Sequence, residues 1–153
     1  MSITYNEHIK TVNDALYDLI LSEFTKIKIR YCRDFESEYL GSNGQYIRFF
    51  YENDEFLGRH TDGEIRIFHY TISQYHDQYK YNKRDEFENE VAKQSDRLTT
   101  LICDDPSYIL SGATIWFDAN MDREYIEMLD DEDNKTNIIE MKHDLRLTRG
   151  LTW

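Results

Sequence analysis

The order and periodicity of the apolar residues predict an α+β fold, in which two helices pack on one face of a mainly antiparallel sheet. Two segments repeat apolar residues at three- and four-residue spacing, as amphipathic helices do. Several others alternate apolar and polar residues, as strands with one buried face do. The sequence has no internal repeat and no Pro- or Gly-rich linker, so we expect residues 1–153 to form a single domain.

The first helix is predicted for residues 4–24, where apolar residues recur at helical spacing from Ile9 to Phe24. Thr4 and Glu7 have the spacing of a capping box at its start. The segment that follows changes to a period of two, which predicts a half-buried strand. The outward-facing positions of that strand are basic: Lys26, Lys28 and Arg30.

Two further strands are predicted for residues 45–51 and 64–76, with polar turns around 53–55 and 61–63. The later strand is apolar or aromatic on both sides. It is therefore either the central strand of the sheet or a strand that packs against a neighbouring subunit.

The second half of the chain is predicted to contain one helix and two strands. The helix covers residues 85–103, with a second capping box at its start, and it ends before Pro106. Residues 113–119 are predicted as a short strand, followed by a short helical turn near Tyr125. The clearest alternation lies in residues 138–149, which predicts the last strand.

The chain is acidic, with 30 Asp and Glu against 18 Lys and Arg and a formal net charge of -12. Residues 104–134 contain ten acidic residues and one basic residue, whereas residues 25–33 contain four basic residues and no acidic one. Such patches are either ordinary solvated faces or complementary surfaces that join copies of one protein or two partners. In the second case the interface candidates are Lys26, Lys28, Arg30, Asp118, Asp122, Asp130, Asp131 and Asp133.

No sequence motif for catalysis stands out. The chain has no phosphate-binding loop and no nucleophile elbow. Residues 118–122 resemble the start of a calcium-binding EF-hand loop, but Arg123 occupies the position that requires glycine. His60, Asp62 and His143 would supply the two-histidine, one-carboxylate set of non-haem iron oxygenases. The first two also fit a hairpin turn, and we expect no catalytic residue, no cofactor and no metal.

Aromatic residues make up 14% of the chain and include 12 tyrosines, a large set for one small core. Tyrosine combines an apolar ring with a polar hydroxyl and is enriched at protein–protein interfaces. The aromatic residues from Phe49 to Tyr81 are therefore expected either to fill the core or to face another polypeptide. Stacking on nucleic-acid bases is the weaker interpretation, because few cations are interleaved with them.

In its layout the whole chain resembles the tail-terminator (tail-completion) proteins of tailed bacteriophages. Four segments carry the resemblance: YNEHIKTVNDALYDLI (5–20), IRIFHYTISQY (65–75), FENEVAKQSDRLTTLI (87–102) and IIEMKHDLRLTR (138–149). The resemblance implies a long β-hairpin at residues 45–76. It also implies a ring, usually a hexamer, that caps the tail tube and joins it to the neck. DNA would pass through the lumen without specific binding, since an acidic lumen repels phosphates.

The resemblance implies a structural protein located in the virion, at the tail or neck, and made in the host cytoplasm. The implied partners are further copies of the chain, the tail tube protein and a neck or connector protein. Three alternatives stay open: another phage neck or connector protein, an acidic interaction or inhibitor module, and a non-haem iron enzyme. No membrane partner is expected, because no apolar run approaches the ~20 residues of a spanning helix and the first residues lack a signal-peptide pattern.

Overall fold

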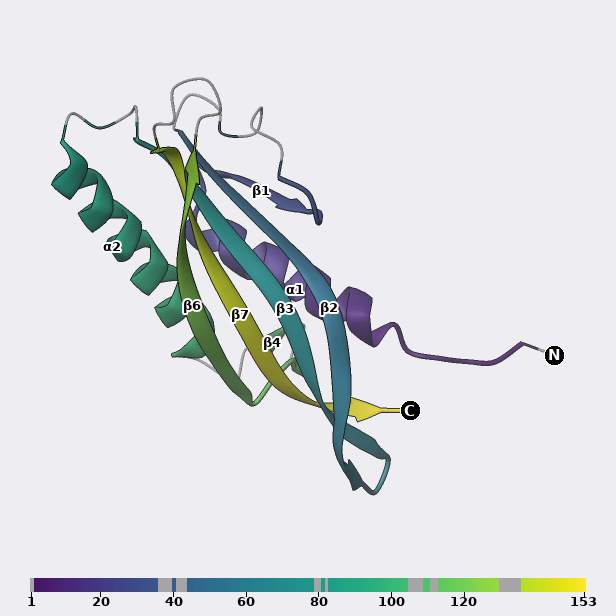
Figure 1. Cartoon of the computed structure of the whole chain (residues 1–153). Coiled ribbons are helices and arrows are strands. Elements are labelled where there is room, and N and C mark those ends of the chain that lie inside the picture. Colours follow the sequence, from purple (N-terminus) through teal and green to yellow (C-terminus); the bar gives the residue numbers. More distant parts are fainter. Residues whose placement is uncertain are drawn as a thin grey trace.

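The computed structural model describes residues 2–35, 40, 44–78, 81, 83–104, 109–110, 113–129 and 136–153. Its elements are α1 (His8–Glu23), β1 (Lys28–Tyr31), β2 (Gln45–His60), β3 (Gly63–Asp77), α2 (Arg84–Cys103), β4 (Ile109–Leu110), β5 (Ala113–Thr114), β6 (Asp118–Leu129) and β7 (Thr136–Thr152). Five strands form a sheet in the order β1-β2-β3-β7-β6 (Figure 1). In this sheet β1 runs parallel to β2 and all other neighbours are antiparallel, which confirms the predicted α+β class.

Both helices cover the same face of this sheet. In Figure 1, α1 passes behind the strands, and α2 lies beside β6 and β7. The main core lies between the helices and the sheet, where Leu16 and Leu98 of the two helices pack in one cluster with Phe49 and Leu145 of the strands. We call the other face, which no described helix covers, the open face. Its side chains come from alternate strand positions and include Arg30, Arg48, Ser73, Lys142 and Glu124.

β2 and β3 form the long β-hairpin that the resemblance implies, with a two-residue turn between His60 and Gly63. The prediction that β2 ends at residue 51, before a turn, is wrong. The strand continues through two irregularities in its register and pairs with β3 as far as His60. A bulge of this kind inserts an extra residue without ending the ladder. Gly63 is needed at the tip, because a Cβ there would overlap the carbonyl oxygen of Leu151 in β7.

The predicted capping boxes do not form. α1 begins at His8 and α2 at Arg84, and neither start has a side-chain cap. The segment before α1 is instead tied to the end of β7, where the Asn6 side-chain amide donates to the Thr152 carbonyl at 2.8 Å. Contacts with the rest of the protein, rather than capping, therefore define the start of α1.

The acidic segment that begins at Asp118 is a strand, so the prediction of a helical turn near Tyr125 is wrong. β6 pairs with β7 along its whole length. Its residues Ala119 and Met121 lie opposite core residues of β7, so that the first part of the strand packs on the main core. The strand predicted for residues 113–119 is also wrong, because only Ala113–Thr114 are extended before β6 and they pair with β4.

β3 is the central strand of the five, which decides between the two interpretations of its apolar sequence. Most of its side chains are buried on both faces of the sheet. Much of the aromatic set from Phe49 to Tyr81 also lies inside the protomer, and its buried members are Phe49, Phe68, Tyr70 and Tyr75. Core filling therefore accounts for these four, without a second polypeptide. Tyr79 lies outside the described residues.

Candidate assembly interface

The five-stranded sheet ends in two edges of opposite charge, formed by β1 and β6. We call the basic residues of β1 and of the turn before it the basic edge: Lys26, Lys28 and Arg30. We call the acidic residues of β6 that share the open face the acidic edge: Asp118, Asp122 and Glu124. Four interstrand spacings, about 19 Å in total, separate the two edges. The basic edge and the acidic edge therefore do not meet within one protomer.

Alternation along β1 directs its basic side chains away from the helices. Ile29 is buried in the main core. Lys28 and Arg30, on either side of it, consequently point toward the open face. Lys26 and Lys28 are exposed and Arg30 is half-buried, so this edge presents positive charge to solvent.

Beside the basic edge, Arg48 of β2 is buried and has acceptors inside the protomer. Its Nε and Nη2 donate to the hydroxyl of Tyr75 at 3.0 and 2.6 Å, and its guanidinium lies 3.7 Å from the Glu140 carboxylate. Glu140 in turn accepts a hydrogen bond from Ser73 Oγ at 2.6 Å. Burial raises the pKa of Tyr75, so its hydroxyl stays protonated in this network. The accessible positive charge at this edge therefore comes from β1 and the turn before it.

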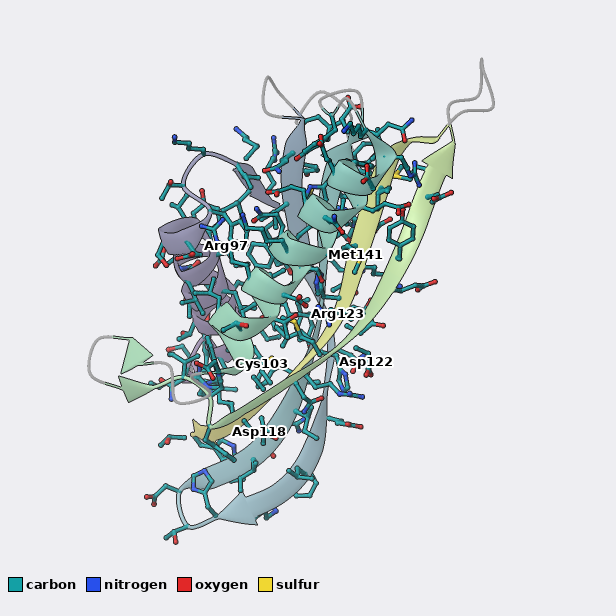
Figure 2. All side chains as sticks on the ribbon, turned by 90° about the vertical axis from the view of Figure 1, so that its left-hand side faces the viewer. Arg97, Cys103, Asp118, Asp122, Arg123 and Met141 are labelled. Carbon is teal, nitrogen blue, oxygen red and sulfur yellow. The ribbon has the colours of Figure 1, made fainter. Side chains whose placement is uncertain are left out.

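On the acidic edge, β6 places oxygen-bearing side chains at every second position of the open face: Asp118, Asn120, Asp122 and Glu124. Arg146 of β7 donates to Asn120 Oδ1 at 2.7 Å and to Asp122 Oδ2 at 2.9 Å. Figure 2 shows Asp118 and Asp122 along this strand, with Arg123 on the side toward α2. The extended backbone contradicts the EF-hand interpretation, since that site requires a tight loop.

Three of the predicted interface residues, Asp130, Asp131 and Asp133, lie outside the described residues. Conversely, Glu124 of the acidic edge was not among the predicted interface residues. The available signal is the period of two from Asp118 to Glu124.

Each edge also presents a tyrosine on the helix-covered side. Tyr31 of β1 is 47% exposed, and its ring packs edge-on against Phe49 with 5.2 Å between the centroids. Tyr125 of β6 is 43% exposed, and its hydroxyl accepts a hydrogen bond from Arg84 at 3.1 Å. Both rings are thus positioned by the fold while part of their apolar surface stays accessible, which is typical of residues at protein interfaces.

One pair of side chains has the geometry of a nucleophile and its base. His143 Nδ1 donates to the Ile72 carbonyl at 3.1 Å, which leaves Nε2 to accept from Ser95 Oγ at 3.0 Å. Both side chains have 0% exposure, so substrate has no route to the serine. Burial also lowers the pKa of His143 to about 4. The pair joins α2 to β3 and β7 and acts in the packing of the helix.

The residues considered for an iron site do not come together. His60 lies at the tip of the hairpin, where its Nε2 is 2.9 Å from the Leu151 carbonyl oxygen. His143 lies in the core and pairs with Ile72, nine positions along β3 from the partner of His60, or roughly 30 Å. Among the described residues no group of three or more His, Cys, Asp or Glu is placed to hold a metal ion.

Within the described residues, neither helix has the length and apolar character needed to cross a membrane. No protein-family model matches the sequence, and no curated protein matches it.

Proposed function

We propose that this protein is a structural component of a tailed-phage virion, located at the head–tail junction. Copies of the chain form a ring that caps the tail tube and connects it to the neck, as in the tail-terminator proteins that the sequence resembles. The observation that carries the proposal is the opposite charge of the two sheet edges, β1 and β6. A protein with this role acts through its contacts and needs no active site.

The charges of the edges favour one kind of contact between copies. Two basic edges repel each other, and so do two acidic edges, which disfavours symmetric dimers built on either one. A basic edge against an acidic edge brings opposite charges together. Such a head-to-tail contact uses different surfaces on the two copies, and its repetition generates a ring when the rotation closes.

The net charge of -12 fits a channel for DNA rather than a DNA-binding surface. Proteins that grip nucleic acid do so through cations that neutralise phosphates. A ring of acidic subunits repels the phosphates instead, so DNA moves through without specific binding.

The oligomeric state of the purified chain tests the proposal. At low ionic strength, where charge contacts are least screened, light scattering should report one discrete closed oligomer. Reversing the basic edge with Lys26→Glu, Lys28→Glu and Arg30→Glu should shift the protein to monomers. Reversing the acidic edge in the same chain, with Asp118→Lys, Asp122→Lys and Glu124→Lys, should restore the oligomer.

A matched control reverses two lysines and one arginine away from both edges: Lys10→Glu, Arg59→Glu and Lys93→Glu. It changes the net charge by the same amount and should leave the oligomer intact. An oligomer that survives reversal of the basic edge would remove these residues from the interface. A chain that stays monomeric under all conditions, alone and with tail tube protein, and binds a basic protein tightly would favour the acidic inhibitor module instead.

A further inference from the structure

We infer that neighbouring copies join by main-chain strand pairing, in which β1 of one copy adds to β6 of the next and the two sheets become continuous. This inference rests on the proposed ring and specifies how its subunits make contact. Within the described part of the chain, β1 pairs only with β2, and β6 pairs only with β7. Each therefore has one side along which a further strand can add.

The strand directions suit this contact. β1 is parallel to β2, and the direction then reverses at β3, at β7 and at β6. β1 and β6 consequently run in opposite directions at the two ends of the sheet. Rotation about an axis along the strands preserves these directions, so β1 of one copy meets β6 of the next in antiparallel orientation. An antiparallel pair forms the more stable ladder per residue.

The register brings one pair of opposite charges to the same level. Each strand's residue has a direct partner on the next strand, and these partners run from Arg30 through Arg48, Ser73 and Lys142 to Glu124. Arg30 and Glu124 therefore lie at the same level on the two edges of the sheet. These five positions share the open face, since directly opposed residues point to the same side. A neighbouring copy added without a shift along the strands therefore places its Arg30 opposite Glu124.

The same register brings the edge tyrosines together. Tyr31 is level with Arg123, and Ile29 is level with Tyr125. Across the contact, Tyr31 is thus the diagonal neighbour of Tyr125, a separation that aromatic side chains span. Both rings are about half exposed in the protomer, and the contact would cover them. The occupant of each edge that fits both the charges and the rings is a second copy of this chain.

Cross-linking tests the inference in the full chain, with the native thiols removed by Cys32→Ser and Cys103→Ala. In that background, Lys28→Cys and Ile126→Cys place thiols directly opposite each other on the open face of the joined sheet, and Arg30 and Glu124 stay intact. A short bismaleimide should link neighbouring copies into a ladder that ends at the size of the ring. The matched control combines Lys28→Cys with Glu55→Cys, an exposed position on the same face in β2, and should yield only background linkage.

A charge swap provides an independent measure of register. Arg30→Glu or Glu124→Arg alone should weaken the contact about five-fold, and the two together should restore it. Combining Arg30→Glu with Asp118→Arg should not restore it, because Asp118 lies six residues away along β6. A ring that forms but shows background linkage and no rescue would overturn strand pairing while leaving the proposed ring in place. Absence of any oligomer would overturn both.

Discussion

Phe49 and Phe50 are neighbours in β2, but they lie on opposite faces of the sheet and in different surroundings. Phe49 is 1% exposed and belongs to the main core with residues of α1 and α2. Phe50 is half-buried on the open face, where the guanidinium groups of Arg33 and Arg48 lie 4.8 and 5.4 Å from its ring centroid. Helices thus cover Phe49, whereas the ring of Phe50 is covered in part by neighbouring polar side chains.

The buried polar residues of the open face follow the same rule. Thr71 and Ser73 of β3 are almost fully buried, and each hydroxyl donates to a carboxylate, of Glu52 at 2.7 Å and of Glu140 at 2.6 Å. Pairwise contacts of this kind contribute less to folding than a shared apolar core does. We call the face of the sheet that α1 and α2 cover the covered face. We therefore expect substitutions there to change the free energy of unfolding most, and substitutions at the edges of the sheet to change assembly.

The largest effect should come from Phe49→Ala. Removing a fully buried ring leaves a cavity between the helices and the sheet and should lower the free energy of unfolding by about 3–5 kcal/mol. Phe50→Ala removes the same atoms from the open face and should lower it by about 1–2 kcal/mol. Urea unfolding followed by circular dichroism measures both. Equal losses in the two variants would contradict the division between the faces.

The elements of the covered face were largely predictable from the sequence, because burial of one side of a helix or strand makes apolar residues recur at a fixed spacing. The stripe that contains Val12, Leu16 and Ile20 predicted α1, and strict alternation predicted β7. β2 beyond Tyr51 was missed for the opposite reason. Most of its side chains there are exposed, so polar residues such as Asn53 occur within a strand and read as a turn.

The edges were only half predictable. The basic edge follows from alternation in a short segment, and Lys28 and Arg30 lie where that alternation places them. The acidic edge was obscured because β6 is an edge strand with many exposed charges and few buried residues. Which strand lies at which edge depends on the order β1-β2-β3-β7-β6, and pairing between distant segments leaves no local signal in the sequence.

The covered face should also make stability sensitive to acid. His76 is 2% exposed, and neither ring nitrogen has a hydrogen-bond partner among the described residues. Burial lowers the pKa of His76 to about 4, with His143 adding to this effect and Glu90 opposing it. Because this pKa lies below the ordinary 6.5, the unfolded chain binds more protons between pH 6.5 and 4. The free energy of unfolding should therefore fall as the pH falls through this range.

His76→Leu should remove that contribution. Between pH 6.5 and 4.5 the variant should lose about 2 kcal/mol less stability than the parent protein, measured by urea unfolding at a series of pH values. His69→Leu is the matched control on the open face, where the histidine Nε2 lies 3.3 Å from Glu55. The His69→Leu variant should lose as much stability between pH 6.5 and 4.5 as the parent protein, because His76 is still present. Identical pH profiles for His76→Leu and the parent would show that His76 does not contribute to acid sensitivity.

Two glycines of the β2–β3 hairpin differ in the space that is available for an added methyl group. A Cβ at Gly58 meets no atom within 4 Å, whereas a Cβ at Gly63 would overlap the Leu151 carbonyl oxygen of β7. Gly63→Ala must therefore separate the hairpin tip from β7, and it should lower the free energy of unfolding by about 2 kcal/mol. Gly58→Ala should change it by less than about 0.5 kcal/mol. Since backbone rather than a flexible side chain causes the overlap, a tolerated Gly63→Ala would mean that the end of β7 does not pair closely with the tip.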